Sequence, residues 1–238
     1  MEPEFFAAVQ RGNRSVVADM LRRDPRLARA AAAHAKTGLH WAAETDDVEV
    51  ARLLVDAGAD IEAETSWGAT PLDWAAVMGS ARVADLLLAR GATGLTLTSA
   101  AALGKIDVVR SVIESGADLQ AHLRRGAPAV ASGDEWPADT AHVQGEVLSD
   151  AMYAAARNGH DHVVAFLLDA GASVDAKGFF GATGLHWAAI NGHRRTVELL
   201  LSRGASPVIR DARFKTTPGS WAAEGGHTDI ARLLRAFE

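Results

Sequence analysis

The sequence of 238 residues contains no cysteine, a single tyrosine and only 6% aromatic residues. The absence of cysteine excludes disulfides, thiolate metal sites and thiol catalysis, and it fits a reducing compartment. An excess of positive charge is also missing, because the net charge is −6 and the short basic clusters stand beside acidic residues. A nucleic-acid surface would normally show a basic stripe, so we expect no nucleic-acid partner.

Long apolar runs are missing as well, since no run approaches the length of a membrane span. The first residues, MEPEFFAAVQRGN, contain neither the basic nor the apolar region of a secretory signal. We therefore expect a cytoplasmic protein that makes no membrane contact. Hydrophobic residues nevertheless make up 48% of the chain, and many of them are alanine, which favours closely packed helices.

One pattern recurs along the chain. Four clear copies begin at a threonine: TGLHWAAETDDVEVARLLVDAGAD at Thr37, TPLDWAAVMGSARVADLLLARGA at Thr70, TGLHWAAINGHRRTVELLLSRGA at Thr183 and TPGSWAAEGGHTDIARLLRAFE at Thr217. In each copy the threonine can cap a short first helix, and a second helix carries apolar residues at helical spacing. Glycine suits the turn between the helices and the residue after the second helix. Each copy therefore predicts two helices followed by a projecting polar finger.

These motifs closely resemble the ankyrin-repeat family, because T-[PG]-L-H-x-A-A, G-H and L-L-x-x-G-A-D all occur. The usual spacing near 33 residues is the ankyrin period. The resemblance implies an all-α ankyrin-repeat solenoid of about seven helix-pair units, with a concave face built from fingers and first helices. It implies one domain with these parts: an N-terminal capping repeat at 1–36, repeats at 37–118, an insertion loop at 119–147, repeats at 148–215 and a C-terminal capping repeat at 216–238.

The repeat spacing has two adjacent irregularities. Equivalent anchor residues are separated by 34, 33, 25, 55, 33 and 34 positions, and they are Ala7, Trp41, Trp74, Ser99, Ala154, Trp187 and Trp221. The short spacing predicts a shortened finger between repeats 3 and 4, and the long spacing predicts the insertion at 119–147 before repeat 5. Such an insertion could fold over the concave face, or it could be a surface loop of the kind that repeat arrays tolerate at little cost.

The concave positions are polar at both ends of the array and apolar in its middle. Exposed contiguous apolar surface usually marks a binding site. The candidate binding surface consists of Trp67, Val77, Met78, Leu103, Trp136, Arg157, Asn158, Phe179, Phe180 and Ile190. The alternative is that the insertion packs on the apolar members and buries them. Tryptophan at the shared position of Trp41, Trp74, Trp187 and Trp221 predicts packing between the helix layers.

No catalytic motif, phosphate loop or zinc motif is found, and no cofactor or metal is expected. The resemblance implies structural roles for most histidines, namely His40, His186, His160, His193 and His227. Acid–base chemistry would need polar groups beside a pocket. The groups that belong to the irregular centre are Asp73, His122, Asp134, Glu135, His142 and Tyr153, and they are the catalytic candidates.

Two functions follow from these features. The resemblance implies a protein-interaction scaffold that binds an unidentified protein partner on its concave finger and first-helix surface, and rigid repeats with variable surface residues support this. The alternative is a small-molecule-binding protein or an enzyme, with an apolar pocket for a small apolar ligand at the central repeats, covered by the 119–147 insertion. Function resides in sites placed on folds, so a solenoid does not exclude chemistry. We expect a monomer.

Overall fold

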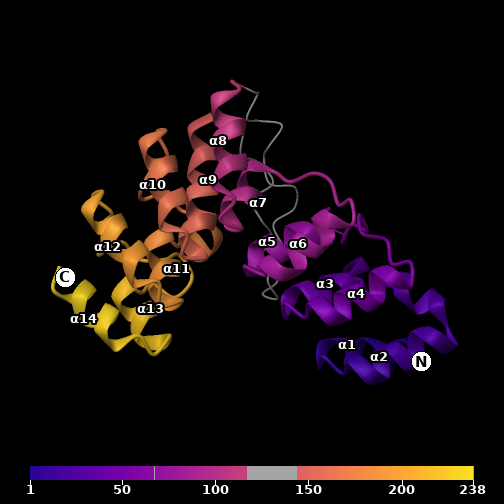
Figure 1. Ribbon diagram of the computed structural model, residues 1–238. Coiled ribbons are helices and arrows are strands. Elements are labelled where there is room, and N and C mark those ends of the chain that lie inside the picture. The colour runs from indigo at the N-terminus through magenta and orange to yellow at the C-terminus, as the bar shows by residue number, and fades with distance from the viewer. Residues whose placement is uncertain (67, 117–143, 238) are drawn as a thin grey trace. The chain divides into compact units, whose positions relative to one another are not determined.

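The computed structural model describes residues 1–66, 68–116 and 144–237. Within these residues the helices α1 to α14 follow one another in pairs, and no strand is formed (Figure 1). The first helices of the pairs are α1 (Glu2–Gln10), α3 (Gly38–Glu44), α5 (Pro71–Met78), α7 (Leu97–Ala102), α9 (Gln144–Arg157), α11 (Gly184–Ile190) and α13 (Pro218–Glu224). The second helices are α2 (Arg14–Arg23), α4 (Val48–Asp56), α6 (Ala81–Ala89), α8 (Ile106–Glu114), α10 (Asp161–Asp169), α12 (Arg194–Ser202) and α14 (Thr228–Arg235). The predicted all-α fold is confirmed.

The described residues divide into two compact units. The first unit, residues 1–95, contains α1 to α6, and the second, residues 96–116 and 144–237, contains α7 to α14. Within each unit the first helices of neighbouring pairs contact one another, and so do the second helices (Figure 1). Each unit is therefore a stack of helix pairs, as the repeat pattern predicts.

The local sequence explains where a first helix begins and ends. Before α5, the Thr70 hydroxyl accepts the Asp73 backbone N–H at 3.2 Å, while the Asp73 carboxylate accepts the Thr70 backbone N–H at 3.1 Å. This reciprocal capping satisfies two donors that a helix N-terminus leaves without partners, and Pro71 suits the first helical position. The helix ends at Gly79, whose φ of 72° is accessible to glycine without steric cost.

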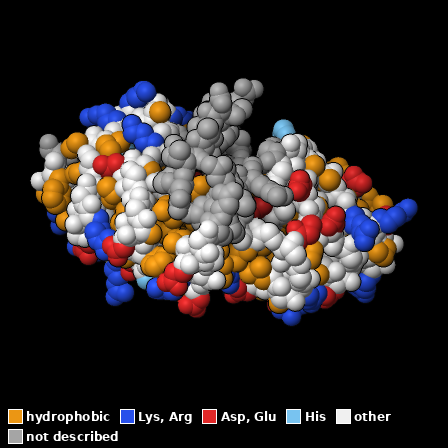
Figure 2. Space-filling model, turned by 90° about the horizontal axis from the view of Figure 1, so that it is seen from above, with side chains coloured by type: hydrophobic (Ala, Val, Ile, Leu, Met, Phe, Trp, Pro, Cys, Tyr) orange, Lys and Arg blue, Asp and Glu red, His pale blue; other side chains and the backbone are white. Residues whose placement is uncertain are grey.

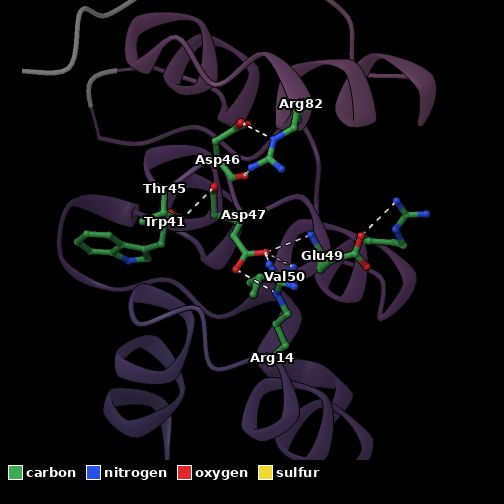
Figure 3. Close-up of polar contacts among 10 residues, drawn as sticks. Arg14, Trp41, Thr45, Asp46, Asp47, Glu49, Val50 and Arg82 are labelled. Atoms are coloured by element: carbon green, nitrogen blue, oxygen red, sulfur yellow. Dashed lines mark hydrogen bonds and ion pairs between the residues drawn. The ribbon is translucent and has the colours of Figure 1, made fainter. Parts of the chain in front are cut away.

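In repeat 2, which consists of α3 and α4, Asp46 occupies the turn position where repeat 3 has Gly79. Asp46 has a positive φ of 48°, and its carboxylate accepts Arg82 Nε at 2.8 Å and the Val83 backbone N–H at 3.0 Å (Figure 3). The neighbouring Asp47 caps α4 and pairs with Arg14 at 3.1 Å. These two carboxylates thus connect repeat 2 to repeat 3 on one side and to repeat 1 on the other.

The core lies between the first and second helices of each unit. The motif alanines from Ala42 to Ala222 are fully or almost fully buried, so the two helices of a pair approach closely, and leucines of the second helices fill the remaining space. Close packing of this kind makes each pair depend on its neighbours for burial of its apolar face. The largest fully buried leucines of the second helices are Leu54, Leu87, Leu167, Leu200 and Leu234.

We call the segment that joins one pair to the next a finger. Four fingers of ordinary length comprise residues 24–37, 57–70, 170–183 and 203–217, whereas residues 90–96 form the predicted short one. The boundary between the two compact units falls in this short finger, after Leu95. The insertion expected at 119–147 lies mostly outside the described residues, and its end lies within α9, which begins at Gln144. Among the described residues, every helix is too short or too polar to cross a lipid bilayer.

Candidate functional site

The face drawn in Figure 2 carries interspersed acidic, basic and apolar side chains among the described residues, so charge alone marks no site there. A cavity of about 490 Å³ does mark one, between repeats 6 and 7 of the second unit. Its walls come from the fingers 170–183 and 203–217 and from the first helices α11 and α13. The lining residues are Phe180, Trp187, Ile190, Phe214, Thr216, Ser220, Trp221 and Glu224.

The aromatic side chains of the cavity form a connected set. Trp187 and Trp221 meet edge to face, with ring centroids 5.1 Å apart and planes at 82°. Phe214 contacts Trp221 at 6.3 Å and Phe180 at 6.0 Å, again with the rings inclined to one another. Such inclined pairs are the arrangement that aromatic rings prefer, so the walls hold one another in place.

The two fingers are tied together at the cavity. The Ala212 backbone N–H donates to the Phe180 carbonyl oxygen at 2.7 Å. A Cβ atom at Gly181 would lie 2.7 Å from the Ala212 side chain, so the two finger backbones touch at this point. Phe180 itself has a positive φ of 61°, which an L-residue adopts only when surrounding contacts hold it. Phe180 and Phe214 are therefore presented by a fixed pair of fingers.

Asp211 organises the finger that carries Phe214. Its side chain is almost fully buried and accepts the backbone N–H groups of Phe214 and Thr216. Burial would raise the pKa of Asp211, but these hydrogen bonds outweigh burial and lower the pKa to about 2. The same carboxylate accepts the Trp221 indole N–H at 3.2 Å, and Thr216 Oγ1 accepts it at 3.0 Å. Trp221 is thereby fixed in orientation.

Two guanidinium groups lie on the faces of the aromatic walls. The Arg157 guanidinium is 4.4 Å from the Trp187 ring centroid, and that of Arg213 is 4.7 Å from Phe180 and 5.4 Å from Phe214. These distances are within the range in which a cation is attracted to the negative face of an aromatic ring. One face of each of these three rings is thus already covered by positive charge.

The motif histidine behind the cavity has a structural role. His186 Nδ1 accepts the Thr183 backbone N–H at 3.1 Å, which leaves Nε2 to donate to the Thr216 carbonyl at 3.3 Å. Burial is the main cause that lowers the pKa of His186, which favours the neutral ring. His40 makes the same contacts with Thr37 and with the Ala69 carbonyl. The structural role implied for these two histidines is confirmed.

In repeats 2 and 3, a lysine side chain occupies the place that corresponds to the cavity. The Lys36 ammonium lies 3.3 Å from the ring centroid of Trp41 and 4.3 Å from that of Trp74. It also forms an ion pair with Glu44. Lys36 is buried, and this burial lowers its pKa in spite of the carboxylate. One lysine therefore occupies the space between the two indoles of this unit.

The candidate binding residues are spread over both units. Phe180 and Ile190 line the cavity, and Arg157 covers one of its walls. Val77 and Met78 are half-buried on α5 of the first unit. Leu103 was expected on the exposed surface and is instead buried, because α7 packs against the long helix α9.

The other predictions for this surface have mixed outcomes. Asn158 donates its side-chain amide to the Ala102 carbonyl at 2.8 Å, which ties repeat 5 to repeat 4. Trp74 and Trp221 are buried as expected, but Trp41 and Trp187 are only half-buried and face the finger side. Trp67, Trp136 and the side chain of Phe179 lie outside the described residues.

Two of the catalytic candidates lie among the described residues, one in each unit. Asp73 caps α5, and Tyr153 is buried in α9 of the other unit. The other four candidates, His122, Asp134, Glu135 and His142, lie outside the described residues. In the described part of the chain, no three His, Asp or Glu side chains are grouped as metal ligands would be.

Sequence reasoning missed most of the cavity. Phe214 occupies the same finger position as Phe180, 34 residues further along, and this one-period relation could have identified it. The shared repeat position of Trp187 and Trp221 predicts core packing, and Glu224 belongs to the polar concave positions at the end of the array. A comparison of Lys36 and Glu44 with their counterparts Ala182 and Ile190 would have shown where the surface differs between repeats.

Comparison with known proteins supports the repeat pattern. A family model described as ankyrin repeats, in three copies, matches residues 5–96 and 138–211, which together exceed half of the chain. These stretches contain α2 to α6 and α9 to α12 completely, and most of α1. No curated protein matches the chain.

Proposed function

Because the chain belongs to the ankyrin-repeat family, we propose that it is a protein-interaction module that binds a partner on the fingers and first helices of repeats 6 and 7. Ankyrin repeats are in general protein-interaction modules. The observation that carries the proposal is the aromatic cavity, which opens between two tied fingers and two first helices. A rigid stack that presents variable finger residues is suited to this task.

The chemistry of the cavity supports a binding role. Phe214 keeps 57% of its surface exposed although it contacts Trp221 and Phe180. An exposed aromatic side chain at the mouth of an aromatic cavity is unusual on a surface that binds nothing, and aromatic and arginine side chains dominate the energetics of protein interfaces. The cavity unites four aromatic residues with Arg157 and Arg213 at their faces. A partner side chain that entered it would be largely desolvated.

Two matched variants test this function. Phe214→Lys places a charge in the cavity, whereas Phe237→Lys places the same charge at a comparably exposed phenylalanine, 56% exposed, that does not line it. We expect both variants to melt like the wild type, since both positions are exposed. Partners captured from cell extract should be retained by Phe237→Lys and lost by Phe214→Lys. Equal capture by both variants would contradict the proposed site.

Small-molecule binding is a second candidate function. The volume of about 490 Å³ lies within the range of small-ligand pockets. Neither of the described catalytic candidates, Asp73 and Tyr153, lines the cavity, so we propose this alternative as binding rather than catalysis. A panel of small apolar compounds would separate the two functions. Specific binding that shifts the melting temperature of the wild type but not of Phe214→Lys would favour the alternative.

A further inference from the structure

The first helices of both units carry an equivalent pair of tryptophans, and the two pairs have different neighbouring side chains at two repeat positions. Trp41 and Trp187 are equivalent in the repeat, as are Trp74 and Trp221. Where repeat 2 has Lys36 and Glu44, repeat 6 has Ala182 and Ile190. The Lys36 ammonium separates the first pair of indoles, whereas Ala182 is too short to do so and the second pair is in direct contact at 5.1 Å. The scaffold is the same, and the smaller side chain leaves the cavity open.

The finger that supplies Phe214 is basic, whereas the finger that supplies Phe180 carries one acidic and one basic residue, Asp175 and Lys177. Lys177 lies on the finger that supplies Phe180, and Arg210, Arg213 and Lys215 lie on the finger that supplies Phe214. Lys177, Arg210 and Lys215 are exposed and form no ion pair with any described acidic side chain. The one acidic residue of the second finger, Asp211, is buried and accepts hydrogen bonds from its own finger.

The equivalent finger of the first unit has the opposite charge. Residues 57–70 carry Asp60, Glu62 and Glu64 and no basic residue. In a chain with a net charge of −6, the basic finger 203–217 at the cavity is therefore a local feature rather than a property of the whole surface. Local charge of one sign beside an apolar cavity selects partners of the opposite sign.

We propose that the cavity takes an apolar side chain, preferably aromatic, from a partner segment in which the flanking residues are acidic. The proposal rests on the protein-binding function proposed above and specifies the chemistry of the partner. The aromatic walls bury the apolar side chain, and the acidic neighbours meet Lys177, Arg210 and Lys215.

A cationic side chain is the main competitor, since Lys36 shows that an ammonium fits between two such indoles. In repeat 2 that ammonium is paired with Glu44. In the cavity, Ile190 occupies the position that corresponds to Glu44, so no carboxylate is present at that position to pair with a cation. The guanidiniums of Arg157 and Arg213 already lie on the aromatic faces. Glu224 is the one acidic residue of the lining. A further cation would meet two positive groups there, so the charge balance favours an apolar side chain with acidic neighbours.

Three peptides test the proposal on the full chain. They are acetyl-Asp-Glu-Phe-Glu-Asp-amide, the same peptide with alanine at the centre, and acetyl-Lys-Lys-Phe-Lys-Lys-amide. Nuclear magnetic resonance of the tryptophan indole N–H groups reports binding, and the signals of Trp41 and Trp74 serve as controls in the same sample. We expect the acidic phenylalanine peptide to shift the signals of Trp187 and Trp221, and to bind about ten-fold more tightly than either other peptide.

Charge-reversal variants test the role of the fingers. Arg210→Glu with Lys215→Glu should weaken the acidic peptide about five-fold. The matched control, Arg232→Glu with Arg235→Glu, changes two exposed arginines of α14 by the same charge and should leave the affinity unchanged. High salt should weaken binding to the wild type and have less effect on the finger variant.

A variant that fills the cavity with a lysine side chain tests whether the open cavity is needed for binding. Ala182→Lys with Ile190→Glu copies Lys36 and Glu44 into repeat 6, and it should abolish the peptide-induced shifts of Trp187 and Trp221. Because Ala182 is fully buried, Phe214→Lys serves as a second variant that blocks the cavity from its exposed side. Unchanged peptide binding in a folded form of either variant would overturn the proposal.

Other outcomes identify a different occupant. Equal or tighter binding of the lysine peptide, or of the alanine peptide, would overturn the proposed chemistry. Indole shifts that depend on protein concentration alone would show a second copy of the chain in the cavity, which also overturns it. If cell partners are captured through Phe214 while no acidic peptide binds, the inference fails and the protein-binding function stands. If capture is independent of Phe214, the proposed function fails as well.

Discussion

Repeats 2 and 3 and repeats 6 and 7 place the same two tryptophans on their first helices, with different results. Between Trp41 and Trp74 lies the ammonium of Lys36, paired with Glu44. Trp187 and Trp221 contact one another and line a cavity. The capping threonine and the motif histidine are common to both regions, so the frame is constant and only a few facing side chains change.

This difference shows how a repeat protein separates stability from recognition. The capping threonines, buried histidines and alanines occupy the same positions in both regions and hold the helix pairs together. The positions of Lys36 and Glu44 face the finger side, so they can change from a partly buried ion pair to alanine and isoleucine without altering that frame. A binding site can therefore arise in one repeat by the loss of a side chain that fills the equivalent space in another.

Acidification should lower the free energy of unfolding of both regions. Of the changes predicted below, we expect it to have the largest effect on this free energy. His40 Nδ1 accepts the Thr37 backbone N–H, so a proton at that nitrogen would remove the hydrogen bond. Burial lowers the pKa of His40 from 6.5 to about 4, whereas the unfolded chain titrates near 6.5. Its contribution is complete above about pH 6.5 and is lost as the pH falls toward 4, by about 3 kcal/mol. Chemical denaturation over this pH range measures the loss.

The control for the pH prediction is His40→Asp. Aspartate occupies the equivalent position in repeat 3, where Asp73 accepts the Thr70 backbone N–H. The variant should be less stable at neutral pH, because it lacks the hydrogen bond from Nε2 to the Ala69 carbonyl, but its stability should fall less between pH 6.5 and 4.5. A pH profile identical to that of the wild type would show that His40 does not cause the loss.

The Lys36–Glu44 pair can be converted stepwise into the residues of repeat 6. Glu44→Ile leaves a buried ammonium without its carboxylate and should cost about 2 kcal/mol, less than for a fully buried pair because Glu44 is partly exposed. Lys36→Ala with Glu44→Ile removes both charges and should recover more than half of this loss. Urea unfolding followed by circular dichroism measures both free energies. A double variant less stable than Glu44→Ile would show that the indoles stabilise the ammonium without help from Glu44.

Most of the frame could be predicted from the sequence, because it follows from short-range chemistry. A threonine, a small residue and a motif histidine at fixed spacing define a capped helix wherever they occur, and the copies at Thr37 and Thr183 fold alike. The short finger was also predictable, because counting residues between Trp74 and Ser99 requires no knowledge of packing. The start of α9 at Gln144 is harder to read from the sequence, because its first turn precedes the recognisable motif that begins at Asp150.

The site was harder to predict, because it depends on side chains that are distant in sequence and on exposure that varies at one repeat position. Trp187 and Trp221 occupy equivalent positions, yet Trp221 is buried while Trp187 is half-buried. Leu103 appeared to belong to the exposed surface, but α9 covers it. The contact between Phe214 and Phe180 depends on the hydrogen bond between their fingers, which no motif encodes.

The two indoles of the cavity should respond differently to loss of their N–H groups. Trp221 donates to Asp211 and Thr216, whereas the buried Trp187 N–H has no acceptor among the described residues. Both substitutions by phenylalanine remove the same atoms, so each serves as the control for the other. Trp221→Phe should be about 1 kcal/mol more destabilising than Trp187→Phe in urea unfolding. Equal losses would indicate that shape rather than hydrogen bonding fixes the Trp221 ring.

The smallest effect should come from the ion pairs between second helices, where the two units can also be compared. Arg14 pairs with Asp47, whose side chain is only 11% exposed because it also caps α4. Arg194 pairs with Asp229, and both of these side chains are at least half exposed. Arg14→Ala should cost about 0.5 kcal/mol, whereas Arg194→Ala should leave the melting temperature unchanged, since exposed pairs are screened by water and salt. A larger loss from Arg194→Ala than from Arg14→Ala would mean that exposure does not decide the strength of these pairs, and that the connection between repeats 6 and 7 depends on charges that repeats 1 and 2 do not need.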